Sequence, residues 1–198
     1  MAQVHLFPSV LGVRQGITDL AAALTAEGHS VTTVDLLDGE TFDDYEPAAA
    51  RVEATGFPAL MSRALEATAG VAPFVAVGFS NGAGMAQWVA ASRPEEALGV
   101  LMVGGGLPMR LLEVPWPKGV PGQVHVTAED PFHADERQFD DELQDDVEHA
   151  GGEFTFVEYQ GKGHLFNDPT LPAEYQPEEA RILTRRILEF VDEVGAIG

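Results

Sequence analysis

The chain is predicted to fold as an α/β protein, with a mostly parallel sheet covered by helices on both faces. Three observations predict this fold. Short apolar runs alternate with segments whose apolar residues recur at helical spacing. The run 74–77 is apolar throughout, as a strand buried on both faces should be. A turn of the pattern Gly-x-Ser-x-Gly joins one run to a helix-prone segment, and parallel strands need such crossover helices.

Three strands and three helices are predicted in the first half of the chain. The strands are the apolar runs 4–7, 31–34 and 74–77. The first helix has one apolar face and stops at a glycine; its residues are Ile17, Leu20, Ala21 and Leu24, followed by Gly28. The second helix carries Leu60, Met61, Ala64 and Leu65, with Pro58 near its first turn, and the third covers 83–91. Segment 35–56 is acidic and is predicted to be surface loop with some helix.

The second half continues the alternation. Strands are predicted at 98–103, 124–127 and 154–157. The first of them runs into three glycines at 104–106, and a proline-rich connection follows at 107–122. One helix is marked by Phe139, Leu143 and Val147, and a final one by Leu183, Ile187, Val191 and Val194. In such sheets, binding sites lie beyond the carboxyl ends of the strands.

Composition restricts the function. At 198 residues the chain fits one domain, 1–198. The 32 acidic and 11 basic residues give a net charge of -21, so nucleic acids and anionic membranes are not expected as partners. That charge suits either a salt-rich cytoplasm or simple solubility. No cysteine is present, which excludes a cysteine nucleophile and thiolate metal sites. The sequence has no signal-like or membrane-spanning apolar stretch, so a cytoplasmic protein is expected. The expected oligomeric state is a monomer or a homodimer.

Ser80 is the first candidate catalytic residue. It stands in Gly78-Phe79-Ser80-Asn81-Gly82, between a predicted strand and a predicted helix. This pattern is typical of a nucleophile elbow, where side chains at the two glycines would collide with neighbouring elements. Ser, Asn and Gly are also common in ordinary turns, so the motif needs an acid and a histidine after it.

An acid and a histidine do follow, each after its own predicted strand. Asp130 follows 124–127, and His164 lies in the glycine-rich loop after 154–157. Glu129 and Asp135 are rival acids, and Asp130 is preferred because loop backbone can fix its short side chain. Solvated loop roles remain the alternative for both residues. The order serine, acid, histidine is that of the α/β-hydrolase triad.

These residues predict acyl transfer. His164 would take the proton of Ser80, Asp130 would orient the imidazole, and water would resolve an acyl-enzyme. Backbone N–H groups of Asn81 and Val10 are expected to form the oxyanion hole. No cofactor or metal is needed. The side chains suggested for the substrate pocket are apolar residues that could equally be core: Phe79, Leu107, Met109, Trp116 and Phe166.

The chain resembles the dienelactone hydrolase family, a compact branch of the α/β-hydrolases without a separate cap domain. The resemblance covers nearly the whole chain, from 4 to 194. Its specific parts are Gly78-Phe79-Ser80-Asn81-Gly82, Ala128-Glu129-Asp130, Gly163-His164-Leu165-Phe166 and the last helix. It implies one α/β-hydrolase domain and a carboxylic ester hydrolase acting on a small ester or lactone.

Three positions depart from what that resemblance implies. The founding enzymes of the family carry a cysteine nucleophile, where Ser80 stands here. They carry a glutamate in the first loop, where Ser9 stands, and an arginine that grips the substrate carboxylate, where Asp168 stands. We therefore expect repulsion of a dianionic lactone at Asp168, and poor turnover of true dienelactone.

Two other hypotheses come from different classes. The fold could serve a non-catalytic ligand-binding protein, because fold alone does not determine function. His125, Glu129 and His133 could ligate a metal, although their spacing runs from strand into loop and puts them on no common helix face.

Overall fold

The computed structural model describes residues 1–70, 73–133 and 137–196. Its elements alternate as predicted. The strands are β1 Gln3–Phe7, β2 Ser30–Thr33, β3 Phe74–Phe79, β4 Ala97–Val103, β5 Gly122–Thr127 and β6 Phe154–Tyr159. The helices are α1 Gln15–Ala26, α2 Tyr45–Thr55, α3 Phe57–Thr68, α4 Asn81–Ser92, α5 Met109–Leu112, α6 Arg137–His149 and α7 Pro177–Gly195.

The six strands form one sheet in the order β2-β1-β3-β4-β5-β6. Each neighbouring pair in the described chain is parallel. The central strand β3 is buried at every position, which its unbroken apolar sequence predicts. The expected α/β fold is therefore confirmed, and the sheet is parallel throughout its described strands.

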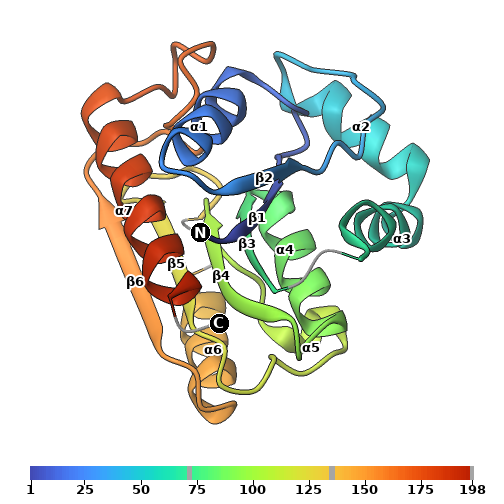
Figure 1. Cartoon of the computed structure of the whole chain (residues 1–198). Coiled ribbons are helices and arrows are strands. Elements are labelled where there is room, and N and C mark those ends of the chain that lie inside the picture. The colour runs from blue at the N-terminus through green and yellow to red at the C-terminus, as the bar shows by residue number, and fades with distance from the viewer. Residues whose placement is uncertain (71–72, 134–136, 197–198) are drawn as a thin grey trace.

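Helices cover both faces of the sheet (Figure 1). The α1 and α7 helices lie on one face, where Leu20, Leu24, Leu183 and Ile187 join an apolar cluster with the strands. On the other face α3, α4 and α6 pack over a second cluster of buried side chains. Two apolar layers on one sheet explain why the central strands β3 and β4 carry no polar side chains.

The sheet order reverses direction between β1 and β3. The chain passes from β1 outward to β2, then returns to β3 on the other side of β1. Loops after β1 and β3 therefore open away from each other at their carboxyl ends, which creates a crevice there. The loop after β1 contains residues 8–12, and the turn after β3 contains Ser80.

The connection 107–122 differs from the expectation of loop alone. It contains α5, a single turn of four residues that begins after Pro108. One turn is too short to show helical periodicity, so the sequence pattern could not reveal it. In segment 35–56, α2 accounts for the predicted helical part.

Candidate active site

Ser80 lies at the turn between β3 and α4. Its backbone has φ 55° and ψ −125°, in the region that residues other than glycine rarely adopt. A Cβ at Gly78 would collide with the Gly82 carbonyl, and one at Gly82 would collide with the Phe7 and Pro8 carbonyls. Both glycines are therefore required for the α4 N-terminus to approach β3 and the loop after β1 so closely.

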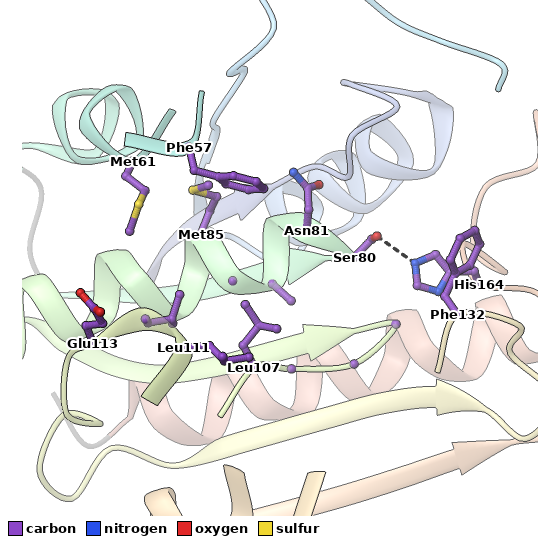
Figure 2. Close-up of a pocket in the computed structure, with 16 residues that line it drawn as sticks. Phe57, Met61, Ser80, Asn81, Met85, Leu107, Leu111, Glu113, Phe132 and His164 are labelled. Atoms are coloured by element: carbon purple, nitrogen blue, oxygen red, sulfur yellow. Dashed lines mark hydrogen bonds between the residues drawn. The ribbon is translucent and has the colours of Figure 1, made fainter. Parts of the chain in front are cut away.

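The side chains of Ser80, His164 and Asp130 form a continuous hydrogen-bonded chain. His164 Nε2 lies 2.8 Å from Ser80 Oγ, as the dashed line in Figure 2 shows. His164 Nδ1 lies 2.7 Å from Asp130 Oδ2. The other oxygen of Asp130, Oδ1, accepts the Phe132 N–H at 2.9 Å, and the residue is 2% exposed. The Phe132 N–H thus holds the Asp130 carboxylate within its own loop.

The loop that carries His164 is tied down on both sides. Thr127 Oγ1 donates to the Gly163 carbonyl at 2.9 Å. Gln176 Oε1 accepts the N–H groups of Lys162 and Gly163, each at 3.0 Å. These bonds connect the loop to the end of β5 and to the residue before α7, so the histidine is held by the sheet and the last helix.

Glu174 links this histidine loop to α2. Its Oε2 accepts the Leu165 N–H at 2.7 Å, directly after His164. The Tyr45 hydroxyl donates to the same carboxylate, at 2.9 and 3.1 Å from its two oxygens. Burial, followed by the charge and the hydrogen bond of Glu174, raises the pKa of Tyr45 above its ordinary value, so the phenol stays a donor.

The imidazole of His164 is enclosed by rings and by bare backbone. The Phe132 ring lies 4.6 Å away and the Tyr45 ring 6.2 Å away, between centroids. Gly104 faces the same imidazole: a Cβ there would lie 2.8 Å from His164 Cε1. The glycine run after β4 therefore makes room for the histidine, a purpose that the sequence pattern did not indicate.

The residues predicted for the oxyanion hole lie near each other. Asn81 is the first residue of α4, and the first amides of a helix have no acceptor within it. The Ser80 N–H already donates to the Val103 carbonyl at 2.7 Å. Val10 and Asn81 both line a small cavity of about 20 Å³.

A cavity of about 660 Å³ opens beside Ser80. That volume is typical of small-molecule sites. Figure 2 shows the Ser80–His164 pair at one end, with apolar side chains lining the space away from it. The residues that line it are Phe57, Met61, Ser80, Asn81, Ala83, Gly84, Met85, Gly104, Gly105, Gly106, Leu107, Leu111, Leu112, Glu113, Phe132 and His164.

Leu107 is the one residue, among the five suggested for the pocket, that lines this cavity. Gln87 holds it there: its Oε1 accepts the Leu107 N–H at 2.9 Å, and its Nε2 donates to the Leu107 carbonyl at 2.7 Å. Phe79 and Phe166 are fully buried in the cluster under α1 and α7. Met109 and Trp116 are buried in the cluster on the opposite face, where the indole N–H donates to the Val120 carbonyl at 2.8 Å.

The cavity walls that sequence reasoning missed come mainly from α3, α4 and α5. Phe57 and Met61 project from α3, Met85 from α4, and Leu111 from α5 (Figure 2). Phe57, Leu111 and Phe132 are large apolar side chains that are about half exposed, at 54, 47 and 47%. An apolar residue on an amphipathic helix gives no sign in sequence that it faces a cavity instead of the core.

Asp168 does not face the cavity, so the expected repulsion of a dianionic substrate at this residue is not the right reason for poor binding. The residue is 4% exposed, and its carboxylate forms an ion pair with Arg14, with Arg14 Nε 2.9 Å from Asp168 Oδ2. Arg14 also contacts the Phe42 carbonyl and pairs with Asp43 at 2.9 Å. None of the described cavity-lining residues is a lysine or arginine, so a dianion still has no counter-charge there.

Ser9 lies outside the main cavity as well. Its side chain is buried, and its Oγ accepts the Leu11 N–H at 3.2 Å within the loop after β1. Ser9 therefore holds the backbone around Val10, and in the described part of the chain it forms no hydrogen bond with the Ser80 side chain.

The rival residues have other surroundings. Glu129 is exposed, and Asp135 falls outside the described residues. His125 bonds to the Tyr159 hydroxyl at 2.8 Å, while His133 bonds to Asp140 at 2.6 Å, which raises the pKa of His133. Among the described residues, no three His, Asp or Glu side chains are grouped to hold a metal ion.

None of the helices in the described residues has the length and apolar character to cross a membrane.

Comparisons with known proteins identify relatives. The model of the "Dienelactone hydrolase family" matches residues 2–195. No curated protein matches the chain. A dienelactone hydrolase-like promiscuous phosphotriesterase from metagenomic libraries superposes with a TM-score of 0.78 at 19% identity, over 98% of this chain and 87% of that one.

Two further crystal structures agree. Dienelactone hydrolase from Anabaena variabilis gives a TM-score of 0.69 at 20% identity, covering 98% of this chain and 86% of that one. Esterase PE8 gives 0.67 at 17% identity, covering 98% and 92%. At these identities, what the superpositions establish is the shared fold.

Proposed function

Because the chain belongs to the dienelactone hydrolase family, we propose that it cleaves small carboxylic esters or lactones through an acyl-enzyme on Ser80. Residues 1–198 would act as one catalytic domain. The observation that carries this proposal is the hydrogen-bonded chain from Ser80 Oγ through both ring nitrogens of His164 to Asp130.

The first half of the reaction forms the acyl-enzyme. Ser80 Oγ attacks the acyl carbonyl carbon while His164 Nε2 accepts the hydroxyl proton. Asp130 keeps the proton of the second nitrogen, Nδ1, in place and stabilises the imidazolium. The carbonyl oxygen becomes an oxyanion, which we assign to the N–H groups of Asn81 and Val10. The imidazolium then protonates the departing alkoxide, and the alcohol leaves.

The second half regenerates the serine. A water molecule donates its proton to His164 Nε2 and attacks the acyl carbon, and the ester bond to Ser80 Oγ breaks. His164 returns the proton to Oγ, and the carboxylic acid is released. The half-exposed apolar rim of Phe57, Leu111 and Phe132 supports substrates with apolar acyl groups.

The test replaces the nucleophile. Ser80→Ala is expected to lower kcat for 4-nitrophenyl butyrate by roughly 10⁴-fold or more, because attack and proton transfer are both lost. Ser92→Ala, at the exposed far end of the same helix, is the matched control and should keep the wild-type rate. A fluorophosphonate should label the wild type and the control but not Ser80→Ala.

Two outcomes would reject the proposal. Hydrolysis by Ser80→Ala at the wild-type rate would assign the chemistry to another residue. Absence of both hydrolysis and labelling in the folded wild type would instead favour a ligand-binding protein on this fold.

A further inference from the structure

Glu113 is the only Asp, Glu, Lys or Arg among the described residues that line the cavity. The other lining residues are apolar, glycine or neutral polar, apart from His164. A single carboxylate in a wall that carries no other Asp, Glu, Lys or Arg can select substrates by charge, because it attracts positive groups and repels negative ones.

Glu113 lies at the end of the cavity away from the reacting atoms. Figure 2 shows it far from the Ser80–His164 pair, beyond Leu107 and Leu111. Met61 and Met85 line the space between the two ends from the α3 and α4 side. An acyl group attached to Ser80 would therefore run along apolar side chains and bring its far end toward the carboxylate.

The Glu113 carboxylate has no structural task in the described part of the chain. It forms no hydrogen bond and no ion pair there. The nearest arginine in sequence, Arg110, is engaged by Glu142, with Arg110 Nε 2.6 Å from Glu142 Oε2. The backbone of Glu113 also has φ 56° and ψ 26°, a left-handed conformation in which glycine would be the ordinary choice.

We propose that Glu113 forms a cation-accepting subsite, so that the preferred substrates are esters whose apolar acyl chain ends in a basic or quaternary ammonium group. The inference rests on the proposed acyl-enzyme at Ser80. It also replaces Asp168 as the reason for discrimination against carboxylate-bearing substrates such as dienelactone: among the described cavity-lining residues, the substrate carboxylate would meet Glu113 and no lysine or arginine.

The effect is expected to be moderate, because Glu113 is exposed to solvent. Water and salt weaken such an interaction, so an ammonium end should gain about fivefold in kcat/KM over a methyl end. A carboxylate end should lose a similar factor. Their ratio should then be on the order of 20, and it should shrink as salt is added.

The experiment compares three 4-nitrophenyl esters of equal chain length, ending in methyl, trimethylammonium or carboxylate. A quaternary nitrogen cannot attack its own ester, so spontaneous cyclisation does not obscure the rate of that substrate. A series of chain lengths identifies the one whose end reaches Glu113. At that length Glu113→Gln should bring the ammonium-to-carboxylate ratio close to one, and Glu113→Lys should invert it.

Glu95→Gln is the matched control. It removes the same charge from an exposed position before β4, at the end of the strand opposite the cavity, and should keep the wild-type ratio. Equal Tm values would show that the variants fold alike.

The possible failures are distinguishable. No hydrolysis of any of the three esters by wild type would overturn the proposed function and this subsite together. Hydrolysis with a ratio near one at every chain length, or a ratio that Glu113→Gln leaves unchanged, would overturn the subsite alone.

Discussion

The absence of a side chain at Gly104 leaves room for the His164 ring. A Cβ at Gly104 would lie 2.8 Å from His164 Cε1, closer than Cβ atoms approach other atoms in proteins, and 3.2 Å from Nδ1. The imidazole sits between two hydrogen bonds, to Ser80 and Asp130, and has little freedom to retreat. A side chain at position 104 should therefore displace the imidazole and lower the rate of ester hydrolysis.

We predict that Gly104→Ala lowers kcat for 4-nitrophenyl butyrate by roughly 10- to 100-fold, because small displacements of reacting groups are costly. Gly119→Ala is the matched control: its φ of +73° resembles the +83° of Gly104, but nothing lies within 4 Å of its Cβ position. Both variants carry a similar backbone penalty of about 1–2 kcal/mol. A wild-type kcat in Gly104→Ala would contradict the prediction.

At the residue scale, the sequence indicates the candidate catalytic side chains better than it indicates the side chains that line the cavity. Ser80, Asp130 and His164 could be chosen because their residue types, and their order along the chain, match those of the α/β-hydrolase triad. Phe79 and Trp116 were chosen for being apolar, and that property is shared by core and cavity wall. The cavity wall depends instead on where helix faces end, as at Met61 and Met85.

At the scale of the elements, the loop that carries His164 is held by α2 and by the segment that leads into α7. Glu174 receives hydrogen bonds from the Leu165 N–H and the Tyr45 hydroxyl, so it joins the loop to α2. For segment 35–56 the sequence predicts only a surface loop with some helix. Its helix thus contributes a support for His164 through Tyr45.

We predict that Glu174→Ala lowers both stability and kcat. The Leu165 N–H and the Tyr45 hydroxyl lose their acceptor, at a cost of about 1–3 kcal/mol in the free energy of unfolding. The loop that carries His164 gains freedom, so kcat should fall more than KM changes. Glu174→Gln keeps an acceptor oxygen and should recover most of the rate, measured with 4-nitrophenyl butyrate beside thermal unfolding. Equal rates in the Ala and Gln variants would show that the carboxylate does not position the loop.

Elements were predictable to different degrees. Long periodic helices such as α7 and the buried strands follow from apolar spacing alone. The single turn of α5 does not, because its conformation depends on packing against α6 through bonds such as the Met109 N–H to Asp146 at 2.8 Å. The loops that support His164 likewise depend on contacts between distant residues.

At the scale of the whole molecule, two buried histidines, His5 and His125, make folding stability sensitive to acid. Burial, with a smaller contribution from the Arg93 charge, lowers the pKa of His5 to about 4, and both its ring nitrogens lack partners among the described residues. Burial likewise lowers the pKa of His125 to about 3, aided by the Arg186 charge. An unfolded histidine titrates near 6.5. The unfolded state therefore binds more protons between these values, and folding stability falls as pH drops through that window.

We predict that Tm falls by several degrees more in wild type than in His5→Leu between pH 7 and 4.5. The comparison with the variant is needed because protonation of the many carboxylates relieves self-repulsion in the same range. The measurement is thermal unfolding at matched ionic strength. Parallel Tm curves for the two proteins would show that His5 does not contribute to the pH dependence.

The overall architecture was the most predictable feature, because parallel strands and crossover helices leave few arrangements. The same rule places residues that follow different strands at one edge of the sheet, and Ser80, Asp130 and His164 do meet there. The charge pattern of the cavity was not predictable, since Asp168 and Arg14 pair only in three dimensions.

The left-handed backbone at Ser80 has an evolutionary consequence. Threonine is branched at Cβ and fits such a conformation badly, whereas cysteine resembles serine in shape. Exchange between oxygen and sulfur at this site would need no rearrangement of the main chain. Lineages built on this turn could therefore have passed between alkoxide and thiolate chemistry by one substitution, while threonine stayed inaccessible to them.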